Sequence, residues 1–279
     1  MDVIAILLAL LICHYWPVSR DWNMRAPFLR YADWLQVRLD LANDWNRTLP
    51  VLLLLLPPVL LTALLQLLLG YRLAGIPALL FGVLVLLLCL PPLRADQLLS
   101  KLIRTLERSR EDQAQQLVDE NLPADRERFG ETASEQAERH ALSEGAPDLL
   151  ALAFWFIVFG PFGAVAWRLA DLARGLAEDH ESGGQALRVW HDWLGWLPAR
   201  LLLCAYGFMG SLQAVLASWR GLGPHVSNRE LLDRSGRAAL HLPADATPVQ
   251  RLTTSRQLIR RALIGLFAAL IVLKLILPI

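Results

Sequence analysis

The sequence predicts an all-α protein that crosses a membrane several times, and two observations support this fold class. Hydrophobic residues make up 55% of the 279 residues and charged residues 19%, a balance typical of membrane proteins. Several apolar runs also approach the roughly 20 residues needed to cross a hydrocarbon core of about 30 Å. Because lipid offers no partner for backbone N–H and C=O groups, each run is expected to be an α-helix. The runs are Val51–Leu69, Leu73–Leu93, Leu149–Trp167, Leu201–Ala217 and Ala262–Ile279.

The N-terminal segment leaves the number of membrane spans at five or six. Its apolar stretch within residues 1–16 is short, so it is either a first span or a helix lying in the membrane interface. We interpret the whole chain, 1–279, as a single integral membrane domain. It would comprise an N-terminal helix and basic segment, 1–49, and two helical loops outside the membrane, 94–147 and 219–261.

Basic residues predict how the chain is oriented. Most Lys and Arg lie in three segments, 20–47, 94–139 and 220–261, and simple alternation of spans puts all three on one side. By the positive-inside rule that side is the cytoplasm, so the C-terminus would face the periplasm of a bacterial inner membrane. This orientation requires the run Leu149–Trp167 to cross fully.

That run contains a potential break. Gly160-Pro161-Phe162-Gly163 lies in its middle, and proline removes a helical hydrogen bond. One interpretation is a kinked helix that still spans. The other is a re-entrant pair of half-helices, which is tolerated only where protein or water shields the freed backbone groups. We expect the kinked spanning helix, because the re-entrant form would place the basic segment 220–261 outside.

The soluble loops carry helix-start signals and a basic cluster. Thr132 with Glu135, and Ser227 with Glu230, have the spacing of N-terminal caps, and Thr247-Pro248 predicts another helix start. Arg251, Arg256, Arg260 and Arg261 follow it. This cluster would either anchor the chain to anionic lipid or bind phosphate, although the chain has no glycine-rich phosphate loop.

Other ligand classes find little support. The net charge of +1 is spread over separate loops, so nucleic acid is not expected as a partner. Cys13, Cys89 and Cys204 lie inside apolar runs without the spacing of metal ligands. We therefore predict no metal site from the cysteines.

Two motifs in the second half resemble the AmpE family of bacterial inner-membrane proteins. The first is Phe154-Trp155-Phe156 followed by Gly160-Pro161-x-Gly163-Ala164-x-x-Trp167-Arg168; the second is His191-Asp192-Trp193-Leu194-Gly195-Trp196-Leu197-Pro198-Ala199-Arg200-Leu201. The resemblance implies a signalling modulator linked to induction of the AmpC β-lactamase. It also implies a gene usually encoded beside AmpD, a peptidoglycan-fragment amidase.

The same motifs are similar to a more distant family, the CobD/CbiB enzymes of cobalamin assembly, which join an amino-alcohol to a corrinoid carboxylate. That family has a Glu-Asn-x-x-Asp signature, of which Glu144 and Asp148 remain here. Its Asn-Thr-Leu-Asp stretch falls on Asp171–Arg174 and is lost, and its Asp-Asp pair falls on His191-Asp192 and is half kept. A ligase of this kind would need carboxylates to hold Mg²⁺ against a nucleotide.

The polar residues in and beside the apolar runs form the candidate site. Glu144 and Asp148 would share one helix face, although Pro147 lies between them and the pair could simply be an acidic helix entry. Arg168 and Arg200 lie at membrane depth, where charges are usually paired. We expect them to pair with Asp171 or Asp192, and arginine would also suit a carboxylate or phosphate ligand. The candidate polar site comprises Glu144, Asp148, Asp192, His191, Arg168, Arg200 and Asp171.

The sequence therefore predicts an inner-membrane signalling modulator in β-lactamase induction or cell-wall stress, rather than an enzyme. One alternative is a diverged CobD/CbiB-like ATP-dependent amide ligase at the cytoplasmic face, the only case in which a Mg-nucleotide cofactor is expected. Another is a transporter of cell-wall fragments, for which the chain shows no evident internal repeat. Expected partners are the lipid bilayer, a protein partner or second copy, and a cell-wall-derived ligand.

Overall fold

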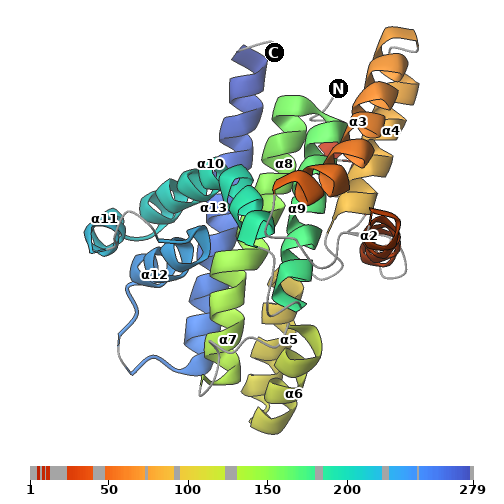
Figure 1. The fold of residues 1–279 in the computed structure, drawn as a ribbon. Helices are drawn as coiled ribbons and strands as arrows, with labels where there is room; N and C mark the ends of the chain where they lie inside the picture. Colours follow the sequence, from red (N-terminus) through yellow and green to blue (C-terminus); the bar gives the residue numbers. More distant parts are fainter. Residues whose placement is uncertain are drawn as a thin grey trace. The chain divides into compact units, whose positions relative to one another are not determined.

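A computed structural model of the chain shows helices throughout its described part (Figure 1). The residues described are 5–6, 8–9, 11–12, 24–39, 48–72, 75–90, 95–122, 131–179, 185–221, 226–243 and 245–276. The prediction for residues 1–16 lies largely outside them. The helices are α2 (Arg25–Leu39), α3 (Thr48–Arg72), α4 (Ile76–Cys89), α5 (Ala95–Glu107), α6 (Glu111–Asn121), α7 (Ala133–His140), the π-helix η3 (Ala141–Gly145), α8 (Ala146–Phe159), α9 (Pro161–Asp179), α10 (Gln185–Met209), α11 (Leu212–Arg220), α12 (Asn228–Leu240) and α13 (Pro248–Ile276).

The chain divides into two compact units. The first, which we call the apolar unit, comprises Met1–Pro92, Ala151–Gly195 and Lys274–Ile279. The second, the charged unit, comprises Leu93–Leu150 and Trp196–Leu273. Each unit therefore combines segments that are far apart in the sequence.

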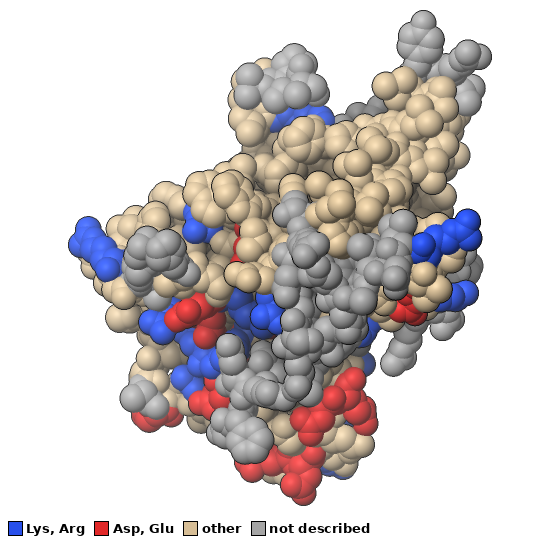
Figure 2. Space-filling model, in the orientation of Figure 1, with Lys and Arg blue, Asp and Glu red and all other residues tan. Residues whose placement is uncertain are grey.

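In the apolar unit, α3 packs against α4 and α9, and α4 also packs against α9. The outward face of α3 is leucine-rich and exposed, at Leu53, Leu56, Leu60, Leu64 and Leu67 among others. Figure 2 shows few charged side chains over α3 and α4, whereas acidic side chains gather over α5 and α6. An apolar helix face exposed to this extent is typical of a lipid-facing surface.

The third apolar run is a helical hairpin, and the expectation of a kinked spanning helix is wrong. The helix α8 ends at Phe159, Gly160 has a φ of +75°, and α9 begins at Pro161. A Cβ on Gly163 would overlap the carbonyl oxygen of Trp155, whereas residues eight apart in one continuous helix are separated by about 12 Å. The chain therefore folds back at Gly160, and the re-entrant alternative describes this run better.

Polar side chains from two other helices bind the backbone at this turn. The Gln66 amide of α3 donates to the Phe159 carbonyl at 3.0 Å and accepts from the Phe162 N–H at 3.1 Å. Lys274 of α13 donates to the Ile157 carbonyl at 2.7 Å. Backbone groups that the turn frees are thus paired inside the protein, as an apolar environment requires. Three carbonyl and amide groups of the turn are satisfied by side chains distant in sequence.

Replacing Gln66 by leucine is expected to destabilise the folded protein by about 2 kcal/mol, because it leaves the Phe159 carbonyl and the Phe162 N–H unpaired. The loss should appear as a lower midpoint in a thermal-melting measurement in detergent. Thr62→Ala is the control, since Thr62 bonds only to Pro58 within its own helix among the contacts shown. Equal midpoints for the two variants would contradict a role for Gln66 at the turn.

In the charged unit, the two predicted loops pack against each other. Contacts join α12 to η3 and to α11, and α5 to α6, α7 and η3. The predicted caps are present: Thr132 and Glu135 form a reciprocal capping box, Ser227 caps α12, and α13 begins at Pro248. The described parts of the segments 94–147 and 219–261 therefore pack into one helical body.

The fourth apolar run, Leu201–Ala217, is not one helix either. The helix α10 ends at Met209, and Ser211 caps α11 through a bond from the Ala214 N–H. At Gly210 a Cβ would overlap the Ala239 carbonyl of α12. The close approach of α12 requires glycine here, and the chain bends away from the direction of α10.

Two helices of the described chain are long and apolar enough to cross a membrane: Leu49–Leu69, and Ala133–Phe159, which comprises α7, η3 and α8. The helix α4 is apolar but shorter. The all-helical class is thus confirmed, whereas the predicted count of five or six spans is not.

Candidate functional site

A buried carboxylate on a π-helical turn is the centre of the candidate site in the charged unit. The side chain of Glu144 is only 6% exposed, and it lies in η3. Its Oε2 is 3.3 Å from Nδ1 of His140, and its Oε1 is 3.3 Å from Nη2 of Arg229. Glu144, His140 and Arg229 therefore form a polar cluster around one buried carboxylate.

Pro147 explains why the chain forms a π-helix here. Proline lacks an N–H and its ring clashes with the carbonyl four residues earlier in a regular helix. The wider turn ends with the Ala146 N–H bonded to the Ala141 carbonyl, and the helix continues into α8. The hydroxyl of Tyr206, on α10, donates to the Leu142 carbonyl at 3.1 Å. π-Turns are frequent at functional sites, and this one holds Glu144 in place.

Arg200 reaches the same end of α12. Its Nη1 donates to the side chain of Asn228, the residue before Arg229, and its guanidinium carbon lies 4.7 Å from the centre of the Trp196 ring. The expected pairing of Arg200 with Asp171 or Asp192 is not among the contacts shown for it. Two residues at the start of α12 thus connect Arg200 and Glu144, both predicted site residues.

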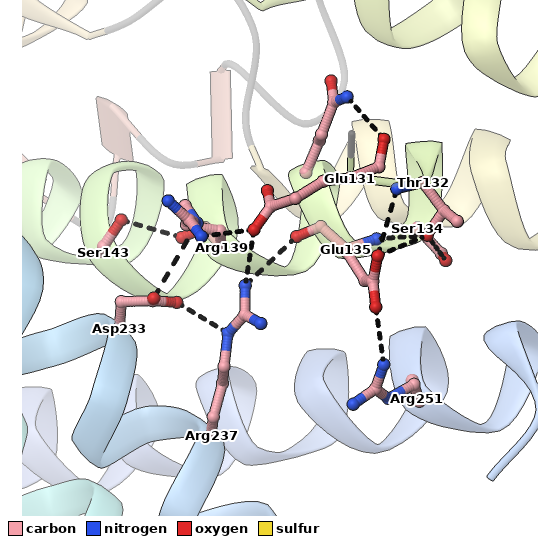
Figure 3. A network of polar contacts seen from close by, with 10 residues as sticks. Glu131, Thr132, Ser134, Glu135, Arg139, Ser143, Asp233, Arg237 and Arg251 are labelled. Atoms are coloured by element: carbon pink, nitrogen blue, oxygen red, sulfur yellow. Dashed lines mark hydrogen bonds and ion pairs between the residues drawn. The ribbon is translucent and has the colours of Figure 1, made fainter. Parts of the chain in front are cut away.

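A network of charged side chains joins α7 to α12 and α13 (Figure 3). Asp233 accepts from Arg237 at 2.8 Å and lies 3.8 Å from Arg139, which also pairs with Glu131. Glu135 pairs with Arg251 at 3.3 Å. Farther along α13, Arg256 binds Asp96 of α5 through two contacts of 2.6 and 3.1 Å. Arg251 and Arg256 of the predicted basic cluster therefore face acidic residues of the other loop.

The electrostatics of this network favour the ionised arginines. Burial acts to lower the pKa of Arg237, but the neighbouring carboxylates, Asp233 first and then Glu138, raise it above its ordinary value. Glu138 is 1% exposed, and one of its carboxylate oxygens has no hydrogen-bond partner among the described residues. Oε2 of Glu131, which also belongs to the network, is likewise buried without a hydrogen-bond partner among the described residues. The network thus holds the two loops together and leaves two buried acceptors in its interior.

The apolar unit contains a second polar cluster. Arg168 Nη1 donates to Asp171 at 2.6 Å, as predicted, and Arg174 lies 3.5 Å from the same carboxylate. The ring of His191 stacks on Trp167 with centroids 4.8 Å apart. One ring nitrogen of His191 lies within 4.8 Å of a carboxylate oxygen of Asp171. Because two guanidinium groups already neutralise Asp171, this cluster suits an ordered ion-pair network more than a divalent cation.

The remaining predicted site residues are Asp148 and Asp192. Asp148 lies in the first turn of α8, where its charge favours the helix start. Asp192 is half exposed, and its carboxylate lies 3.8 Å from Nδ1 of His191. The structure thus places Arg168, Asp171, His191 and Asp192 in the apolar unit, and Glu144, Asp148 and Arg200 in the charged unit.

Several residues that complete these clusters were not among the predicted ones. His140, Asn228 and Arg229 carry no motif of their own, and only the packing of α12 on η3 brings Arg229 to Glu144. Trp167 belongs to the first of the two motifs but was not singled out as a site residue. A partial signal was present for His140, which precedes Glu144 by four residues and so shares its helix face.

Comparison with known families gives a match over most of the chain. The sequence profile described as "Regulatory signalling modulator protein AmpE" matches residues 42–276. This range includes α3, the described helices that follow it, and every candidate site residue.

Two curated relatives match a shorter stretch. "Cobalamin biosynthesis protein CobD" of Stutzerimonas stutzeri (strain A1501) is 31% identical over 99 residues, or 34% of this chain and 32% of the relative. The protein of the same description from Chromobacterium violaceum is 33% identical over 87 residues, or 30% of this chain and 28% of the relative. The match spans about a third of the length of these relatives. No solved structure matches the chain.

Proposed function

Because this chain belongs to the AmpE family of regulatory signalling modulators, we propose that it modulates β-lactamase induction or the response to cell-wall stress from the bacterial inner membrane. The family match over residues 42–276 is the observation that carries this proposal. The resemblance of its motifs to that family supplies the link to β-lactamase, and the ion pairs between the two loops support a route by which a signal could pass through the charged unit.

The proposed membrane topology has five spans, or six with the N-terminal segment. The helices α3 and α4 cross outward and back, α8 and α9 do the same as a hairpin, and the apolar end of α13 crosses outward. The three basic segments then face the cytoplasm and the C-terminus faces the periplasm, in agreement with the positive-inside rule. With the hairpin counted as two spans, the orientation inferred from charge holds because the run Leu201–Ala217, which is divided between α10 and α11, is not counted as a span. Asp171 and Asp192 then lie on the cytoplasmic side.

The charged unit is the proposed signalling element. Its helices are held by ion pairs and capped starts, and it contains the buried Glu144–His140 pair. A ligand that binds here and displaces Arg229 from Glu144 would shift how α12 packs on η3. The expected partner is a cytoplasmic protein or a cell-wall-derived ligand.

The functional test is β-lactamase induction by a β-lactam in a strain that lacks this protein. We expect wild type to restore the response and Glu144→Gln to lower it about tenfold, because the neutral amide cannot form the ion pair with Arg229. Protein levels in the membrane are matched by immunoblot. Reporter activity is the readout.

Glu120→Gln is the matched control, since it makes the same chemical change on the exposed surface of α6. It should behave as wild type. Full restoration by Glu144→Gln would show that the buried carboxylate has no signalling role, and an unchanged response in the deletion strain would overturn the regulatory proposal itself.

A second candidate function rests on the two CobD relatives. We infer that a diverged ligase activity would require magnesium-dependent nucleotide binding that is lost in Asp148→Asn. Retention of Glu144 and Asp148 supports this alternative, whereas the stretch at 171–174 departs from the enzyme signature. A transporter of cell-wall fragments is supported less, and substrate-dependent flux in vesicles would favour it.

A further inference from the structure

We propose that the second half of α10 together with α11 lies flat in the cytoplasmic interface of the bilayer, with its aromatic outer face against lipid. This surface comprises Trp196, Phe208, Leu212, Leu216 and Trp219, and we call it the interfacial face. The proposal rests on the proposed topology, and it replaces the predicted transmembrane run Leu201–Ala217 by a helix pair that does not cross.

The first argument counts how many times the chain crosses the membrane. The hairpin of α8 and α9 returns the chain to the side from which α8 started. The helix α12 that follows α11 pairs through Arg229 with Glu144, and α13 pairs through Arg256 with Asp96, so both lie on the side of α5–α7. Both ends of the segment from α10 to α11 are therefore on one side, and the segment cannot cross once.

The second argument is direction. Figure 1 shows α11 and α12 lying across the axis of α13 rather than along it. The apolar run of α13 begins at Ala262, directly after Arg260 and Arg261. If this run crosses the bilayer, helices that lie across its axis are close to the membrane plane.

The third argument is depth. Met209, the last residue of α10, touches Gly265 of α13: a Cβ there would lie 2.9 Å from the Met209 methyl carbon. Gly265 is four residues beyond Arg261, so this contact is about 6 Å along the helix from the last charge. That is the level at which a hydrocarbon core gives way to headgroups. The bend between α10 and α11 therefore sits at the interface.

The fourth argument is the chemistry of the face. Trp196 is 54% exposed, Phe208 75% and Trp219 49%, whereas the opposite side is buried at Leu202, Tyr206 and Val215. Indole rings favour the membrane interface because they are apolar but carry one N–H donor. Arg220 ends α11, and Arg260 and Arg261 are exposed at the same level of α13. These cations suit anionic headgroups.

The experiment measures the depth of three positions on α10 and α11 in the full-length protein. A fluorescent thiol label is placed on the native exposed Cys204, on Leu212→Cys and on Leu216→Cys, with Cys13 replaced throughout and Cys204 replaced in the latter two. Cys89 is buried and is retained. The protein is reconstituted in vesicles of phosphatidylethanolamine and phosphatidylglycerol, and quenching is recorded with lipids brominated at shallow or deep positions and with aqueous iodide.

We expect all three labels to be quenched most by the shallow lipid and to differ in depth by less than one helix turn, about 5 Å. Leu60→Cys, on the exposed face of α3, is the deep control, and Arg234→Cys, on exposed α12, is the aqueous control. A crossing helix would separate Cys204 from Leu216 by about 18 Å, which would overturn both this proposal and the proposed topology. Quenching by iodide alone, or protection from every quencher by a second copy or another protein, would overturn the interfacial assignment and leave the topology standing.

Discussion

Replacing Gly163 by alanine is expected to destabilise the folded protein by about 3 kcal/mol, the upper end of what overpacking costs. The new Cβ would overlap the Trp155 carbonyl oxygen and would lie 2.9 Å from Cβ of Phe159. Both neighbours belong to the other arm of the hairpin, and the first is backbone, so no side-chain rotation relieves the overlap. The two arms must separate, which also disturbs the contact between the rings of Phe159 on α8 and Phe162 on α9.

The control is Gly175→Ala in the same helix, where a Cβ would have no neighbour within 4 Å. Alanine is favoured over glycine inside a helix by roughly 1 kcal/mol, so this variant should melt at the same temperature as wild type or higher. The readout is the thermal midpoint of monodisperse protein in detergent, measured by size-exclusion chromatography after heating. A Gly163→Ala protein as stable as Gly175→Ala would show that α8 and α9 do not approach as closely as described.

Hydropathy identified where the chain is apolar, but it could not decide where an apolar run turns back. The runs at 149–167 and 201–217 are continuous in composition and are both interrupted in the structure, at Gly160 and at Gly210. The first run carries the break signal Gly160-Pro161-Phe162-Gly163, and the second carries only Gly210. Glycine is needed at 163 and 210 because a backbone carbonyl approaches each position, that of Trp155 in the first case and that of Ala239 in the second. Such contacts depend on tertiary packing, so the sequence alone favoured uninterrupted helices.

Local signals predicted local structure well. The capping box at Thr132 and the cap at Ser227 are present because each needs only residues three apart. The pair of Arg168 and Asp171 is likewise within one helix turn. Arg229 was missed because its partner Glu144 is far away in the sequence. Lys274 binds the Ile157 carbonyl, whereas a lysine near the end of a span usually extends outward to the interface.

Loss of the Asp233 charge is expected to have the largest effect among changes in the charged unit. Asp233→Asn keeps the shape of the side chain but removes the counter-charge of Arg237 and Arg139, which are 29% and 24% exposed. Breaking a largely buried ion pair by neutralising one partner costs about 3 kcal/mol, because the other charge stays buried without compensation. Glu230→Gln on the same helix is the control, since its pair with Arg234 is exposed and contributes less than about 1 kcal/mol.

The two variants also test whether the predicted loops form one body. If α7, α12 and α13 are held by this network, Asp233→Asn should lower the thermal midpoint by several degrees and increase proteolysis in both 94–147 and 219–261, since each loop stabilises the other. Limited proteolysis followed by mass spectrometry locates the cuts. New cuts confined to α12 would mean that the two loops fold separately and that the ion pairs between them do not stabilise either loop. The charged unit could then not transmit a signal from one loop to the other.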